Sequence, residues 1–98
     1  APAPAPSASR EDRKAGKQAR ARLAEATRPL RVELQRVDDR LQKLAAHKLE
    51  VETALAAGGK PEDFADLGRR LTHIAAETAM LEERWLEIQT ELEAAQAG

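Results

Sequence analysis

The stretch LEVETALAAGGKPEDFADL, residues 49–67, contains the end of one helical pattern, a short turn and the start of a second helical pattern. The glycine pair at residues 58–59 suits a helix C-terminus, because glycine adopts positive φ without steric cost. Pro61 is favoured in the first turn of a helix, and the two acids that follow it complement the positive end of the helix dipole. The stretch therefore predicts a turn over residues 58–61 between two helices.

Apolar residues recur at alternating intervals of three and four on both sides of this turn. The series before the turn is Leu23, Thr27, Leu30, Leu34, Val37, Leu41, Leu44, Lys48, Val51 and Leu55. The series after the turn is Phe64, Leu67, Leu71, Ile74, Thr78, Leu81, Trp85, Ile88, Leu92 and Ala95. Such heptad spacing is typical of a coiled-coil seam, and two seams of similar length predict an antiparallel two-helix hairpin. Because each seam can be covered within the chain, we expect a monomer.

The composition favours the same all-α fold. About a third of the 98 residues are charged, and one Phe, one Trp and no Tyr make a thick core improbable. Alternating Pro and Ala at the start of the chain predict a disordered linker over residues 1–12. The hairpin domain is expected over residues 13–97, with the basic arm and first helix at 13–57 and the second helix at 61–96. A chain that opens on a linker is typical of a piece of a larger protein.

Several classes of site are excluded or disfavoured by residue type. Without cysteine there is no disulfide and no thiolate site. No apolar run approaches the roughly 20 residues that span a bilayer, and no export signal is visible, so we expect a cytoplasmic protein without membrane contact.

Patterns for catalysis and metal binding are also missing from the sequence. There is no H-E-x-x-H and no phosphate-binding glycine loop, and a two-helix hairpin offers no cleft for a catalytic triad. We interpret His47 and His73 as partly exposed helix residues. No catalytic residue, metal ligand or cofactor is therefore assigned to this chain.

Pro29 interrupts the first seam, because its ring and its missing N–H disfavour a regular helical turn. In one interpretation Thr27 caps a helix that begins there, and residues 13–26 form a separate or kinked basic helix. In the other interpretation one bent helix runs through. We favour a bend or a break at this joint.

Three seam positions carry unusual side chains. Lys48 and Thr78 are polar, which is explained either by tolerated polarity where the seam meets water or by a role in fixing register or binding. Trp85 is the only Trp, and we interpret it as a packing residue rather than an exposed anchor, because it keeps the seam period.

The register of the hairpin can be predicted from charges beside the seam. Placing Trp85 near Leu30 brings Glu33 close to Arg84 and Arg40 close to Glu77. Placing Trp85 near Val37 would instead bring like charges together. Opposite charges at flanking positions favour a pairing, so we predict the Leu30 register.

Basic residues dominate the segment before the first seam. The segment contains Arg10, Arg13, Lys14, Lys17, Arg20, Arg22, Arg28 and Arg31, against three acids. Such a one-signed excess beside a flexible leader is either a solvated surface or a phosphate-contacting arm that binds without base specificity. No aromatic residue lies among these bases, so base stacking is not expected.

Parts of the chain resemble the C-terminal coiled-coil domain of ABC-F ATPases, in the Uup-like branch and its relatives. The resemblance spans about residues 17–95 and rests on TRPLRVELQRVDDRLQKLAAHKLEVETAL, the Gly/Pro/acid turn, and LEERWLEIQTELE with its late Trp85. It implies a parent protein with two ATP-binding cassettes that uses ATP and Mg and acts on the ribosome. In that branch the hairpin is associated with DNA binding.

Two functions are therefore expected as alternatives. The first is an accessory domain of an ABC-F ATP-binding protein that contacts DNA or ribosomal RNA weakly through its basic arm. The second is a protein-interaction or spacer coiled coil without a nucleic-acid role. In both, this chain is not an enzyme, and ATP hydrolysis belongs to the parent.

Overall fold

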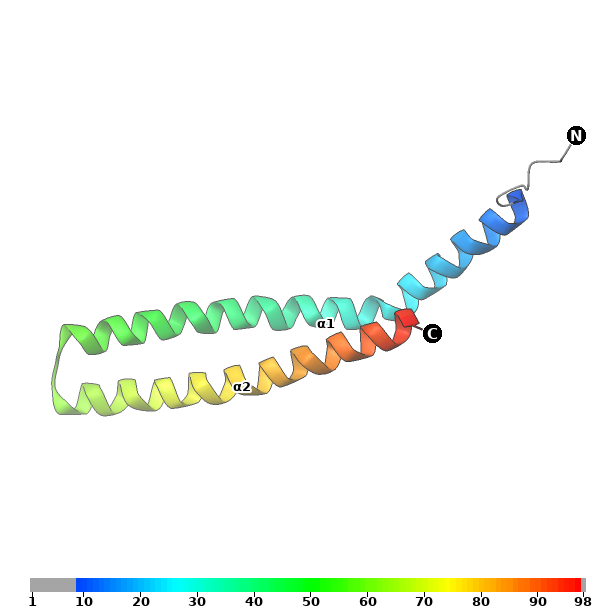
Figure 1. The fold of residues 1–98 in the computed structure, drawn as a ribbon. Coiled ribbons are helices and arrows are strands. Elements are labelled where there is room, and N and C mark those ends of the chain that lie inside the picture. Colours follow the sequence, from blue (N-terminus) through cyan, green and yellow to red (C-terminus); the bar gives the residue numbers. More distant parts are fainter. Residues whose placement is uncertain (1–8, 98) are drawn as a thin grey trace, which may run out of the picture.

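The computed structural model describes residues 9–97, which form two long helices. Helix α1 spans Arg10–Ala57 and helix α2 spans Pro61–Ala97. The two helices run antiparallel and side by side, and α1 continues past the end of α2 as a single projecting helix (Figure 1). These residues contain no strand, and they form a rod of 88 × 20 × 16 Å. The predicted all-α helical hairpin is confirmed.

The first helix begins at Arg10, three residues before the predicted boundary. Ser9 and Asp12 form a capping box: the Asp12 N–H donates to Ser9 Oγ at 3.0 Å, and the Ser9 N–H donates to Asp12 Oδ2 at 3.4 Å. Such reciprocal bonds satisfy N–H groups that have no partner within the helix. Residues 10–12 are therefore helical, and the rest of the predicted linker, residues 1–8, lies outside the described residues.

The turn has the predicted chemistry. Gly58 has φ 85°, the left-handed region that favours glycine, and its N–H donates to the carbonyl of Leu55 at 3.2 Å. Pro61 is the first residue of α2, and the Lys60 N–H donates to Asp63 Oδ2 at 3.2 Å. The turn is therefore residues 58–60, one residue shorter than predicted.

Helix α1 does not break at Pro29; it bends. The proline lies inside the continuous helix, and the ribbon changes direction in its cyan part (Figure 1). Thr27 is not an N-cap, because it lies within the helix and its hydroxyl donates to the carbonyl of Leu23 at 2.9 Å. Near the bend, Arg31 Nη2 donates to the carbonyl of Ala24 at 2.6 Å, seven residues earlier. Side chains thus engage carbonyls around a proline that cannot donate.

The two rows of each seam are buried to different depths. In α1 the buried row contains Val37, Leu44 and Val51, seven residues apart, and in α2 it contains Ile74 and Ile88. We call the other row the edge row; apart from the buried Thr27 near the bend, its members are half-buried or exposed. The edge row contains Leu34, Leu41, Lys48 and Leu55 of α1 and Phe64, Leu71, Thr78, Trp85 and Leu92 of α2. The hairpin therefore has one deep apolar line with a shallower line beside it.

Both ion pairs that the register prediction requires are present. Arg84 binds Glu33 through two hydrogen bonds of 2.6 Å, and Arg40 binds Glu77 through bonds of 2.5 and 2.9 Å. These pairs place position 85 level with about position 32, between Leu30 and Leu34. The two predicted ion pairs thus support the chosen register. Trp85 is not directly opposite Leu30, however, but lies slightly nearer to the turn.

Candidate nucleic-acid interface

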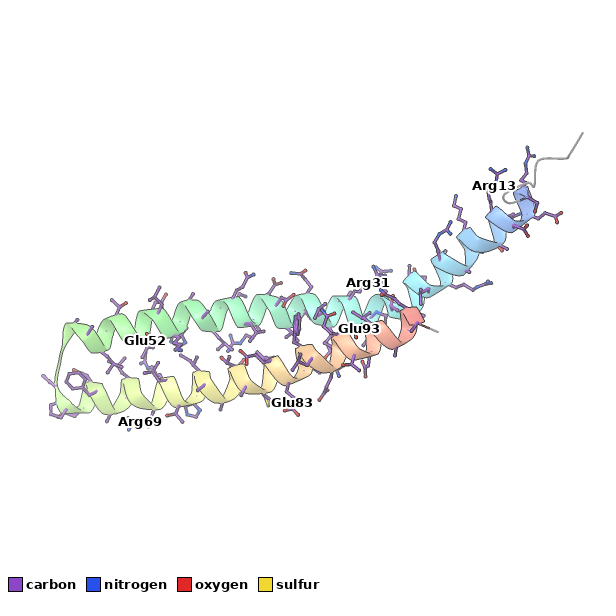
Figure 2. The ribbon with its side chains drawn as sticks, in the orientation of Figure 1. Arg13, Arg31, Glu52, Arg69, Glu83 and Glu93 are labelled. Carbon is purple, nitrogen blue, oxygen red and sulfur yellow. The ribbon has the colours of Figure 1, made fainter. Side chains whose placement is uncertain are left out.

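The predicted basic residues fall into two groups in the structure. Five of them recur at helical intervals on the projecting part of α1 and share about a third of its circumference. We call these five the basic face; they are Arg10, Arg13, Lys14, Lys17 and Arg20. All five side chains are exposed, and Arg13 lies far from α2 (Figure 2). The bend and the greater length of α1 place most of this face beyond the end of the hairpin, whereas Arg20 borders a hollow that Leu92 and Gln96 of α2 also line.

The basic face is not neutralised within the described part of the chain. Between residues 9 and 97, none of its five members lies within ion-pair distance of a carboxylate. Unpaired guanidinium and ammonium groups on a stiff helix can contact successive phosphates, and guanidinium groups can do so through two parallel hydrogen bonds.

The other three predicted residues lie elsewhere. Arg22 projects from a different side of the helix, away from the basic face. Arg28 is 3.9 Å from Glu25, and Arg31 donates to the Ala24 carbonyl at the bend. The structure therefore does not gather all eight predicted residues into one site. The angular position of each residue around a helix can be calculated from the sequence, and it would have separated Arg22 from the five residues of the basic face.

Helix α2 offers no comparable surface. Arg69 and Arg70 lie 3.7 and 3.0 Å from the carboxylate of Asp66, and Arg84 is held by Glu33 and Glu87. Acids outnumber bases in this helix, as in the sequence after Pro61. A polyanion would therefore be repelled by most of α2 and attracted by the arm.

The ion pairs on one side of the hairpin shift the pKa of their members. The hydrogen bond from Arg84 lowers the pKa of Glu33, and the hydrogen bond from Arg40 lowers the pKa of Glu77. The same bonds raise the pKa of each arginine, which stays charged. These four residues close one flank of the seam, opposite the edge row.

The described residues were also searched by side-chain chemistry for metal-ligand clusters, and the two histidines lie on different helices. Residues 9–97 contain no cluster of three side chains able to hold a metal. His47 and His73 are exposed helix residues, as predicted.

Within residues 9–97, neither helix has a stretch long and apolar enough to cross a bilayer. Comparison of the chain with protein-family models, curated proteins and solved structures finds no match.

Proposed function

We propose that this chain is an accessory coiled-coil domain that contacts nucleic acid, DNA or ribosomal RNA, through the basic face of its arm. The observation that carries the proposal is the set of five unpaired cations on one side of a helix that projects beyond the hairpin. The binding unit is a single chain, in which the hairpin acts as a stiff support.

The parent protein follows from the sequence resemblance. An ABC-F ATPase would supply the ATP and Mg chemistry in upstream cassettes, in the cytoplasm and at the ribosome, while this domain would add phosphate contacts. The contacts are sequence-tolerant, because the arm carries no aromatic side chain and no base-reading motif.

The proposal is tested by fluorescence anisotropy with a labelled DNA duplex and a ribosomal RNA hairpin over a salt series. We expect binding at low salt and a log–log salt slope that falls by about 0.9 for each duplex phosphate contact removed. Replacing Arg13, Lys14 and Lys17 with Gln should weaken binding to every sequence alike.

The matched control is the double substitution Arg69→Gln and Arg70→Gln. It removes two positive charges from α2 that are already paired with the Asp66 carboxylate. This variant should bind almost as the unmodified chain does. If neither nucleic acid binds at low salt, or if the arm variant binds normally, the interaction module without a nucleic-acid role becomes the better account.

A further inference from the structure

One flank of the hairpin is open. The edge row lies along it, and three shallow hollows of about 410, 380 and 270 Å³ follow one another from the turn toward the bend. The Glu33–Arg84 and Arg40–Glu77 pairs line none of these hollows, because both pairs lie on the opposite flank. We call this surface the open flank; its charged side chains are Arg20, Arg31, Asp38, Lys48, Glu52 and Glu82.

Positions along the rod can be compared between the two helices, because the residue numbers of each interhelical ion pair add up to 117. A residue of α2 therefore lies level with the α1 residue whose number is 117 minus its own. Glu82 is level with about residue 35, and Ala75 with about residue 42. From the bend to the turn, the charges on the hairpin part of the open flank then alternate: Arg31, the acids Asp38 and Glu82, Lys48, and Glu52.

The second hollow has two acids and no base. Asp38 and Glu82 both line it, and between residues 9 and 97 neither carboxylate lies within ion-pair distance of a cation. Leu41 and Trp85 line the same hollow. A side chain with an apolar stem and a positive end can bury the stem against such residues and place its charge near both carboxylates. The hollow therefore fits a lysine or an arginine from another chain.

A second copy of this chain supplies that base. We propose that two chains pair through their open flanks, about a two-fold axis that crosses the rod level with Ala75, into a four-helix bundle. The axis reverses the direction of the rod, so that α1 packs against α1 and α2 against α2. Lys48 then faces Glu82 of the second copy, within one helical turn of Asp38, and Arg31 faces Glu52. Because the same flank is used by both chains, each of these contacts occurs twice.

Small residues at the centre let the two chains approach closely. Ala75 lies at the axis and faces its own counterpart, and it is exposed in the single chain. Gly68, seven residues earlier on the same side of α2, faces Glu82 of the second copy. A Cβ at Gly68 would meet no atom within 4 Å, so this position leaves room for the Glu82 carboxylate beside Lys48.

Pairing also covers apolar side chains that the single chain exposes. Phe64 of the edge row is 40% exposed, and Leu49, next to Lys48, is 66% exposed. Removing such surface from water supplies the attraction, and the charges select the orientation. Each seam stays paired within its own chain, so the second copy adds to the hairpin without replacing it.

The charges exclude the other two-fold arrangement. An axis along the rod would keep each residue level with its counterpart and would pack α1 against α2 of the second copy. Asp38 would then meet Glu82, and the two acids would repel each other without a base between them. The alternation of charge therefore selects the reversed pairing.

The arms take no part in this contact. In the reversed pairing the turn of each chain lies level with the bend of the other, so both arms project beyond the bundle, at opposite ends. Each arm keeps its own basic face free for phosphate contact. The inference goes beyond the nucleic-acid role and stands if that role fails.

A disulfide test addresses the position of the axis, because the chain has no cysteine of its own. Ala75→Cys should form a disulfide between two chains in a glutathione buffer, since the two residues meet at the axis. Met80→Cys is the control: this side chain is 65% exposed but does not line the open flank, so the variant should stay monomeric on a non-reducing gel. Equal cross-linking of the two variants would overturn the proposed axis.

Sedimentation equilibrium of the full chain without nucleic acid tests the charges. The unmodified chain should form a dimer, and reversing its bases with Arg31→Glu and Lys48→Glu should raise the dimer Kd by at least about tenfold. Reversing the acids with Glu52→Arg and Glu82→Arg should do the same. A mixture of the two reversed chains should restore the dimer, since every facing pair is then opposite in charge again.

The matched control for the first reversal is Arg36→Glu and Lys43→Glu, which makes the same change of net charge on α1 but outside the three hollows. This variant should pair as the unmodified chain does, and circular dichroism checks that every variant keeps its helices. A monomeric unmodified chain, an equal effect of the control, or reversed chains that fail to pair with each other would each overturn the proposal.

Discussion

At the scale of single residues, stability is concentrated where the two helices are closest. Ile88 is fully buried, whereas Leu86, two residues earlier on the same helix, is mostly exposed. The difference arises because a helix turns about 100° per residue, so that only one side of α2 faces α1.

Replacing Ile88 with Ala should therefore destabilise the hairpin by about 2 to 5 kcal/mol, the range for removing a buried aliphatic side chain. Leu86→Ala is the matched control and should change the free energy of unfolding by less than about 0.5 kcal/mol. Guanidinium unfolding followed by circular dichroism at 222 nm measures both. Equal effects of the two substitutions would mean that α2 is rotated about its axis relative to this structure.

The two interhelical ion pairs predict a loss of stability in acid. The pKa of Glu33 and the pKa of Glu77 are held below the ordinary value of 4.5 in the folded chain by their arginine partners. A lowered folded-state pKa gives stability that is fully present above the unfolded pKa and is lost as the pH falls through the folded pKa. The melting temperature should therefore fall as the pH drops below about 4.5.

The variant that carries Glu33→Gln and Glu77→Gln supplies the control for this pH dependence. Its melting temperature should be lower at neutral pH and should change less between pH 6 and pH 3 than that of the unmodified chain. A pH dependence as steep as that of the unmodified chain would assign the acid sensitivity to other carboxylates.

At the scale of the elements, the sequence predicted the turn, the two seams and the ion-paired register, because each depends on local residue type and spacing. It misplaced the start of α1, although Ser9 and Asp12 have the spacing of a capping box. It also left open whether Pro29 ends a helix, because tertiary packing around Thr27 decides that. Unequal burial of the seam rows could not be predicted, since it depends on how far each helix rotates about its own axis.

The bend in α1 predicts the effect of removing its proline. Pro29→Ala should restore an N–H donor for the Glu25 carbonyl, straighten the arm and stabilise the helix by about 1 to 3 kcal/mol. Because the chain has no cysteine, Ala15→Cys and Lys60→Cys provide two unique sites for spin labels. The distance between the labels should increase when Pro29 is replaced.

A matched control for the bend is Thr27→Val, which removes the hydroxyl that donates to the Leu23 carbonyl but keeps the shape of the side chain. If Thr27→Val lengthens the distance as much as Pro29→Ala does, the hydroxyl contributes as much to the bend as the proline does. No change in either variant would place the origin of the bend in packing against α2.

At the scale of the whole molecule, the structure divides into a hairpin that holds itself together and an arm that contributes little to that stability. All five residues of the basic face are exposed, and the buried side chains lie between Thr27 and Ile88. Charge is divided in the same way, with the basic excess on the arm and the acidic excess on α2. The two parts should therefore be separable by truncation.

A chain that begins at Ala21 should keep the melting temperature of the full chain within a few degrees. The removed residues contribute almost no buried apolar area, whereas Leu23 and the carbonyls that Thr27 and Arg31 bind are kept. It should lose binding to DNA and RNA, because the basic face lies on the removed residues. The second truncated chain keeps the whole arm but ends after Glu87, so that the buried Ile88 is removed. It should melt well below the full chain, because the seam loses its last deeply buried contact. Thermal melts of the three chains, followed by anisotropy at low salt, compare these effects. A large fall in the melting temperature of the arm-less chain would show that the arm packs against the hairpin, and binding by that chain would place the phosphate contacts on the hairpin itself.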